Sequence, residues 1–355
     1  MFESWDADCR LHKLIYKGMI NFFIGIDFAK TKFDVVILHK DDLVGKGEHN
    51  QFSNTKDGVK QLEKWLRQVC GKGVSMESVI CGENTGVYSV LAAKTLSHDG
   101  YTVCLESALR IKRSMGISRG KNDKKDARDI AEYSARHYDK LVVYQEPSQT
   151  SEALKTLFTQ RRLLVKQRCD LQRRNKELNG LYKDNPLLKR MLASDTRIIN
   201  TINTEIDKIE AHMMQIIEGD PEFLRVYGIL TSMKGIALVN AVALIVYTDN
   251  FKRFDYDARR ICSYWGIAPF ANQSGTSING KPHVSHFADH YLKSLLSQAV
   301  ICAIRFCPAI SNYAQRLIAK KKHISIVHNN CKNKMIHILV AMVKNDTYYG
   351  EIQKK

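Results

Sequence analysis

Long apolar runs are missing from this sequence. The longest, such as residues 241–247, fall far short of the roughly 18 to 20 apolar residues that a bilayer-crossing helix requires. The N-terminus also lacks the apolar core and the small-residue cleavage site of a secretory signal. We therefore expect a cytoplasmic protein without a membrane partner.

Cysteine pairs of the kind that hold metals are missing as well. The nine cysteines include no CxxC pair and no spacing typical of a zinc site. We interpret them as reduced thiols of the protein core. They are Cys9, Cys70, Cys81, Cys104, Cys169, Cys262, Cys302, Cys307 and Cys331.

Acidic residues are in deficit. The chain of 355 residues has 37 Asp and Glu against 54 Lys and Arg, which gives a formal net charge of +17. The basic residues are spread along the whole chain rather than gathered in one tail. Such an excess favours a phosphate polyanion as partner, because each neutralised phosphate releases counterions and adds salt-dependent affinity. A generally basic protein without such a partner is the alternative.

The first part of the chain alternates between strand and helix patterns. Residues 1–20 show no period and are interpreted as an N-terminal extension. Two strands joined by a short turn are predicted next, and the first of them contains Asp27. The alternation predicts a mixed α/β domain over residues 21–146. Its expected strands are 22–28, 33–39, 78–81 and 101–105, and its expected helices are 59–69 and 87–97.

The rest of the chain is predicted to be mostly helical. Over residues 151–218, leucines and isoleucines at heptad or 3/4 spacing predict two long helices that turn at Pro186 and form an antiparallel coiled coil. A C-terminal domain over residues 221–345 follows, with a tail at 346–355. Residues 230–248 resemble a helix-hairpin-helix, whose backbone N–H groups meet a DNA phosphate. The outer face of the coiled coil is expected to carry a basic set, either simply solvated or in contact with a partner: Arg161, Arg162, Lys166, Arg168, Arg173, Arg174 and Lys176.

Four carboxylates are candidates for metal-dependent phosphodiester chemistry. Asp27 lies inside an apolar strand, where a charge requires a partner or a metal. Glu83 follows the next buried strand in the run CGENTG. Asp123 and Asp126 stand one helical turn apart in KNDKKDARDIAEY, so they share a helix face. Carboxylates that converge from separate elements are what divalent cations at a scissile phosphate require.

Spacing alone leaves the aspartate pair open. Asp129 falls near the same helix face, so the pair could also be Asp126 and Asp129. The neighbouring Arg128 and the two lysines before Asp126 suit a surface that faces phosphate. Each carboxylate also has an ordinary explanation as a capping or loop residue.

The order of four motifs carries a resemblance to a known family. GIDFAKTKFDVVIL, GENTG, KNDKKDARDIA and GIAPFANQSGTSINGK resemble the DEDD transposases of bacterial insertion sequences, a family that includes the Piv DNA invertase and bridge-RNA-guided recombinases. The resemblance implies an RNase-H-like, RuvC-like domain whose catalytic and metal-binding residues are Asp27, Glu83, Asp123 and Asp126, with Mg²⁺ or Mn²⁺ as cofactor. It leaves Asp129 as a bystander.

The resemblance also implies a serine nucleophile. Ser274 of the QSG motif would attack the DNA backbone and form a transient phosphoserine link, and Ser277 is the second candidate. The implied partners are double-stranded DNA at the element ends and the target, a structured guide RNA, and further copies of the chain in a homodimer or homotetramer, with the protein associated with the nucleoid. The N-terminal domain of one subunit would meet the serine domain of another.

The sequence departs from the family at one place. After the serine motif the family has a strongly basic stretch, whereas this chain has HVSHFADHYLK with His283, His286 and His290. The contact with nucleic acid is in doubt there. Two other functions stay open: a RuvC-like structure-selective endonuclease without serine chemistry, and a nucleic-acid-binding protein whose carboxylates only cap and pair.

Overall fold

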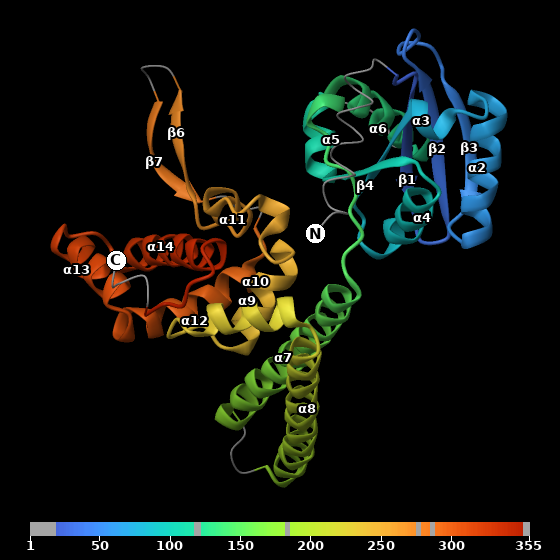
Figure 1. The fold of residues 1–355 in the computed structure, drawn as a ribbon. Coiled ribbons are helices and arrows are strands. Elements are labelled where there is room, and N and C mark those ends of the chain that lie inside the picture. Colours follow the sequence, from blue (N-terminus) through green and yellow to red (C-terminus); the bar gives the residue numbers. More distant parts are fainter. Residues whose placement is uncertain (1–18, 117–121, 182–184, 275–277, 285–287, 351–355) are drawn as a thin grey trace. The chain divides into compact units, whose positions relative to one another are not determined.

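The computed structural model describes residues 19–116, 122–181, 185–274, 278–284 and 288–350, without the side chains of residues 271–283. The chain divides into two compact units, Met1–Glu146 and Pro147–Lys355 (Figure 1). In the described part no single helix is long and apolar enough to cross a membrane. One pair of consecutive helices, His290–Phe306 and Pro308–Ala319, meets the requirement by combined length and composition alone, but the two are bent by 95° relative to each other.

The first unit is built on a five-stranded mixed sheet in the order β3-β2-β1-β4-β5. β1 pairs antiparallel with β2 and parallel with β4, β2 pairs antiparallel with β3, and β4 pairs parallel with β5. The strands are β1 (Phe22–Phe28), β2 (Lys32–His39), β3 (Glu48–Ser53), β4 (Ser78–Glu83) and β5 (Thr102–Glu106). The helices are α2 (Lys56–Cys70), α3 (Val74–Glu77), α4 (Val87–His98), α5 (Ala108–Ser114) and α6 (Asp123–His137), followed by the short η1 (Tyr138–Lys140).

Helices cover both faces of this sheet, because its strands are apolar on both sides. Phe23 and Val79 pack on one face with Ala127 and Ile130 of α6. Residues of the opposite parity, such as Ile24 and Ile80, pack on the other face with α2 and α4. The alternation of side chains along a strand therefore assigns each strand residue to the α6 face or to the α2 and α4 face.

The contact between β1 and α6 is close because β1 has a glycine at its centre. A Cβ placed on Gly25 would lie 2.1 Å from the carbonyl oxygen of Ala127 and 2.4 Å from the amide nitrogen of Ala131. Only a residue without a side chain lets the helix backbone approach the strand so closely. This contact holds α6, at Ala127 and Ala131, against the middle of β1.

The second unit begins with two long helices, α7 (Gln149–Leu181) and α8 (Pro186–Glu218). Cross-helix hydrogen bonds join Arg161 to Glu210 and Arg168 to Asn203. Later residues of α7 therefore bond to earlier residues of α8, which makes the two helices antiparallel. Asn185 caps α8 through its side chain, and Pro186 occupies the first turn, where a missing N–H costs nothing.

The prediction that the basic residues of α7 lie on its outer face is wrong for four of them. Arg161, Arg168 and Arg174 reach across to polar residues of α8, and Arg162 binds Asp289. Long Arg side chains beside an apolar seam satisfy acidic and amide partners on the facing helix. These four guanidinium groups therefore hold the unit together rather than forming a free basic surface.

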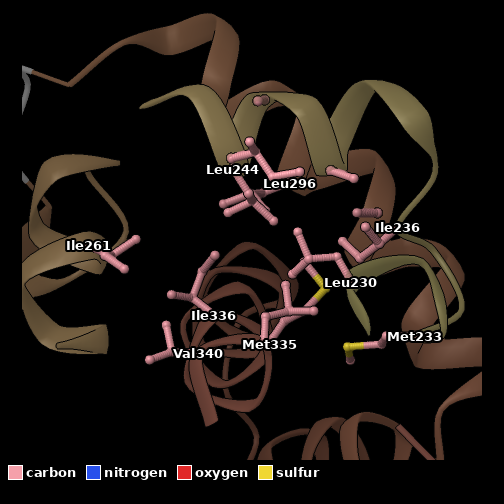
Figure 2. Close-up of a cluster of buried hydrophobic side chains, with 14 of the residues drawn as sticks. Leu230, Met233, Ile236, Leu244, Ile261, Leu296, Met335, Ile336 and Val340 are labelled. Carbon is pink, nitrogen blue, oxygen red and sulfur yellow. The ribbon is translucent and has the colours of Figure 1, made fainter. Parts of the chain in front are cut away.

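The remainder of the second unit is a helical body with one β-hairpin. Its core gathers side chains from many of its helices, among them Leu244, Leu296 and Ile336 (Figure 2). Its elements are α9 (Pro221–Thr231), α10 (Leu238–Thr248), η2 (Lys252–Phe254), α11 (Ala258–Tyr264), β6 (Pro269–Ser274), β7 (Ile278–Val284), α12 (His290–Phe306), α13 (Pro308–Ala319) and α14 (Ile324–Lys344).

Five of the eight described thiols occupy the expected buried positions, while Cys70 and Cys302 are only partly buried. Cys81, Cys104, Cys262, Cys307 and Cys331 are buried. Cys169 is exposed on α7, so its interpretation as a core thiol is wrong; it lies on a long helix whose far side has no layer to cover it. Cys9 lies outside the described residues.

Candidate functional site

Three of the candidate carboxylates lie at one face of the first sheet, two by their positions in the strands and one on the helix that covers this face. Asp27 follows Phe23 and Gly25 at alternate positions of β1, and Glu83 follows Val79 and Cys81 in β4. Both therefore face α6. β1 and β4 are parallel and run side by side up to Ile26 and Gly82, so Asp27 and Glu83 stand at neighbouring carboxyl ends of the sheet. Asp126 lies in the first turn of α6, the helix that covers this face.

The first turn of α6 supplies the other aspartate. Asn122 caps the helix by accepting the backbone N–H of Lys124, which starts α6 at Asp123. A capped N-terminus favours carboxylates because the helix dipole is positive there. Asp123 and Asp126 therefore occupy positions that the helix itself stabilises.

The pKa of Asp27 reports how these groups affect one another. Burial raises it, and the carboxylates of Asp126, Glu83, Asp123 and Asp34 raise it further, to about 6. Like charges oppose the ionisation of a neighbour only over short distances, so four carboxylates act on Asp27 at this end of the sheet. Asp129 is not among them.

Asp129 has different surroundings. Burial raises its pKa, and its charged neighbours are Lys125, Glu132, Asp126 and Arg128. Arg128 does not present a free guanidinium, because it donates to the backbone oxygens of Val44 and Lys46 and to Glu132. The expectation that Arg128 faces phosphate is therefore wrong, since its donors hold the segment between β2 and β3 against α6.

The sequence analysis missed two residues of this cluster. Asp34 is buried on β2 directly opposite Asp27, and its carboxylate accepts hydrogen bonds from His49 and Gln51, each at 2.9 Å. The Lys32 ammonium lies 3.0 Å from Asp123 and 3.7 Å from Asp34. The signal was available: Asp34 is a charged residue at an inward position of the apolar strand KFDVVILH.

The donor chemistry of the cluster fits a hard divalent cation. Mg²⁺ and Mn²⁺ prefer carboxylate oxygens, and a cation would relieve the repulsion that raises the pKa of Asp27. Among the residues that the structure describes, no group of three Asp, Glu, His or Cys side chains is arranged so that it could hold a metal ion. In this arrangement the ammonium of Lys32 balances Asp123 instead.

The serine motif lies in the second unit, on the hairpin of β6 and β7. Ser274 is the last residue of β6, opposite Ile278, and the pairing shifts register between Phe270 and Asn272. The other serine candidate, Ser277, lies outside the described residues, as does His286. His290 is the first residue of α12, which Asp289 caps.

The turn predicted to resemble a helix-hairpin-helix joins α9 to α10. Gly235 has φ 104°, and a Cβ at this residue would lie 2.5 Å from the carbonyl oxygen of Ala299 on α12. Glycine is therefore required here by the packing of the turn on α12. This packing explains why glycine is present at the turn, so the glycine is not by itself a sign of DNA binding.

Comparison with known proteins adds the family to this geometry. The profile of the IS110-type DEDD transposases, described as "Transposase", matches residues 24–181, and that of the "Transposase IS116/IS110/IS902 family" matches residues 227–315. The chain belongs to the IS110 family of DEDD transposases. Its members are enzymes of DNA transposition and recombination, and the first matched range includes all four predicted carboxylates while the second includes Ser274.

Two of the relatives of this IS110-family transposase are similar over nearly the full chain, and a third over less than half of it. The "Pilin gene-inverting protein" of Moraxella bovis is 26% identical over 333 residues, which is 91% of this chain and 96% of that protein. The protein of the same name from Moraxella lacunata has the same identity and coverage. The "Insertion element IS110 uncharacterized 43.6 kDa protein" of Streptomyces coelicolor is 26% identical over 151 residues, 42% of this chain and 36% of that protein.

Proposed function

We propose that this transposase cuts and rejoins double-stranded DNA with two sets of residues, a carboxylate centre and a serine nucleophile. The centre consists of Asp27, Glu83, Asp123 and Asp126, and the nucleophile is Ser274. The observation that carries the proposal is that parallel β1 and β4 end side by side, with Asp27 and Glu83 on the face covered by α6, whose first turn contains Asp123 and Asp126. Burial and the neighbouring carboxylates accordingly raise the pKa of Asp27. Buried carboxylates that repel one another are costly to a fold and are typical of catalytic sites.

The strand order supports an RNase-H-like reading of the first unit. A sheet of three antiparallel strands extended by two parallel ones, with α6 across one face, brings Asp27 to the centre of the sheet. We interpret the pair of α7 and α8 as the coiled coil of the family. Both assignments are fold-level analogies, and the function rests on the carboxylates themselves.

The four carboxylates would hold Mg²⁺ or Mn²⁺, which when bound supplies Lewis acidity and neutralises charge at the scissile phosphate. Asp27 and Glu83 are fixed by their strands and the aspartates of α6 by the capped first turn of the helix. The backbone thus fixes the positions from which the four side chains extend, while the side chains would have to turn to meet a cation. Lys32 would leave Asp123 as the carboxylate turns to the cation.

Serine attack conserves the number of phosphodiester bonds. The Ser274 oxygen forms a bond to phosphorus, the bond from phosphorus to the leaving deoxyribose oxygen breaks, and the serine proton passes to that oxygen. Attack of a second strand's hydroxyl on the phosphoserine reverses these steps. Because the energy of the bond is kept in the link, rejoining needs no nucleotide cofactor.

The test is a covalent adduct assay with the full-length chain and duplex DNA carrying the element ends. Ser274→Ala should abolish the protein–DNA adduct and keep DNA binding, and Ser297→Ala on α12 serves as the matched control. An adduct that persists in Ser274→Ala overturns the role of this serine. Strand cleavage by Ser274→Ala would instead favour a RuvC-like endonuclease.

Site-specific inversion is a second candidate for the same chemistry. The relatives named for inverting a pilin gene are similar over 91% of this chain. Inversion and transposition differ in the placement of the recombining ends and not in the bonds broken. A plasmid with two element ends in opposed orientation separates them, since inversion changes the restriction pattern without loss of DNA.

A guide RNA and assembly into a homodimer or homotetramer complete the proposal by analogy with the family. The net charge of +17 suits a chain that binds two kinds of nucleic acid. Co-purification of the chain with RNA encoded beside its gene, and its mass in solution, test these two points.

A further inference from the structure

A buried lysine without a partner lies in the helical body of the second unit. Lys332 on α14 is 7% exposed, and its ammonium makes no ion pair or hydrogen bond with the described residues. Its Nζ is not one of the fully buried polar atoms without a partner, so the tip of the side chain reaches solvent. Burial, together with the nearby Lys293 ammonium on α12, lowers the pKa of Lys332.

Packing fixes where the two lysines lie. Leu296 on α12 and Met335 on α14, each one turn after a lysine, point into the same apolar core (Figure 2). Lys293 and Lys332 therefore project from the two helices at the edge of that core. The helices are held by apolar contacts, so the lysines keep their places whether or not an anion is bound.

The same edge supports the base of the serine hairpin. Asn329, one turn before Lys332, donates its side-chain N–H to the carbonyl oxygen of Ile267 at 2.9 Å, two residues before β6 begins. Pro269 at the start of β6 pairs with Val284 at the end of β7. Asp289, one turn before Lys293, caps α12. Lys332 thus stands one helical turn from a residue that holds the base of the hairpin, and Lys293 stands one turn from the cap of α12.

We propose that Lys293 and Lys332 form an anion site that holds a backbone phosphate of the DNA strand presented to Ser274. The site deepens the proposed function and rests on it for the identity of the anion. A backbone phosphate carries one negative charge, so between the two ammonium groups it offsets one of the two positive charges, weakens their repulsion and supplies an acceptor for Lys332. Lysine suits this task because it binds phosphate as a point charge without a fixed geometry.

The site would hold the strand away from the reacting phosphate. Ser274 ends β6 five residues beyond Pro269, which is about 17 Å at the rise of a β-strand. Contacts of this kind position a nucleic acid without reading its sequence. Loss of the site should therefore weaken binding uniformly across DNA sequences.

The test measures binding of the full-length chain to duplex DNA in EDTA, over a range of salt concentrations. The variants are Lys332→Met and Lys293→Gln, with Lys334→Met as the control on the same helix, where the ammonium lies over the Tyr313 ring. Each of the first two should weaken binding about tenfold and lower the slope of log K against log salt by about 0.9, the value for one phosphate contact. Lys334→Met should keep the slope of the unaltered protein.

Three results would overturn the site. One is an unchanged slope in both test variants, with Lys332→Met merely more stable, as for a lysine that only covers apolar surface with its stem. Another is an equal loss in Lys334→Met, which means general basicity. The third is an unchanged slope in Lys293→Gln if Lys332→Met does not fold. The assay needs no cleavage, so failure of the serine chemistry leaves its outcome readable.

Discussion

Asp27 and Asp34 stand directly opposite each other in the antiparallel pair of β1 and β2, with both side chains on the face that α6 covers. Opposed like charges destabilise a sheet. Here Asp34 is satisfied by His49 and Gln51, whereas Asp27 is left with a raised pKa. The strand pair thus contains one carboxylate that is satisfied by hydrogen bonds, Asp34, and one whose pKa is raised toward neutral pH, Asp27.

The order of influences on Asp27 is the first prediction. Neutral amides at the neighbouring carboxylates should each lower the pKa of Asp27, with Asp126→Asn the largest change and Asp34→Asn the smallest. Carbon-detected NMR of the side-chain carboxyl in EDTA measures the titration. Asp129→Asn is the control and should have less effect than any of them, because Asp129 is absent from the groups that act on Asp27. A larger shift from Asp129→Asn would reassign the aspartate pair.

Stability should depend on pH through Asp27. Its pKa is raised from 3.8 to about 6 in the folded chain, so the folded state holds the proton more tightly than the unfolded state. The stability from this group is therefore fully present below about pH 4 and is lost as pH rises through about 6. Asp27→Asn should remove that loss.

The comparison is made by urea unfolding of both proteins in EDTA at pH 4.5 and pH 7. The difference in unfolding free energy between Asp27→Asn and the unaltered chain should grow in favour of the variant at the higher pH by about 1 kcal/mol, because Asp27 is only half buried and solvent screens part of the repulsion. A difference independent of pH contradicts the raised pKa. Added Mg²⁺ should reverse the ranking at pH 7, since only the carboxylate binds it well.

The close approach of β1 to α6 predicts a severe effect of one methyl group. Gly25→Ala places a Cβ 2.1 Å from the carbonyl oxygen of Ala127, so strand or helix must move. Overpacking against backbone should cost about 3 kcal/mol of unfolding free energy and displace the first turn of α6. Gly180→Ala near the end of α7, with no atom within 4 Å, is the control and should be neutral or slightly stabilising. Equal effects would refute the contact.

The ion pair between Arg162 and Asp289 should contribute measurably to stability. Two guanidinium nitrogens donate to the two carboxylate oxygens at 2.8 and 3.2 Å, and the guanidinium also lies over the Tyr291 ring. A double-mutant cycle with Arg162→Ala and Asp289→Ala should give a coupling of about 1 kcal/mol or more. The exposed pair of Lys208 and Glu205 should give about 0.3 kcal/mol. A coupling at Arg162 no larger than that value would contradict the expectation.

Sequence reasoning located the elements that have a clear period. The strand expected over residues 22–28 is β1 unchanged, and the helix expected over 87–97 is α4 with one residue more. β3 was missed, because EHNQFS has a single buried residue and no apolar alternation. This segment is a strand because it pairs with β2, a long-range contact that the local sequence does not reveal.

The sequence suggested the members of the candidate site but not the contacts around them. A carboxylate in an apolar strand and two aspartates one turn apart are visible in the residues, so Asp27, Asp123 and Asp126 could be named. The hydrogen bonds from His49 and Gln51 to Asp34, and the ammonium of Lys32 on Asp123, depend on strand register and on the packing of α6. Long-range contacts of this kind leave no period in the sequence.

Asp289 performs two tasks with one carboxylate: it accepts the backbone N–H of Tyr291 at the start of α12, and it binds Arg162 on α7. Tyr291, in the same first turn, also contacts Phe158, Arg161 and Arg162 of α7. The start of α12 is therefore held to α7 by several side chains of one turn, and loss of Asp289 alone should loosen this junction without separating the two helices.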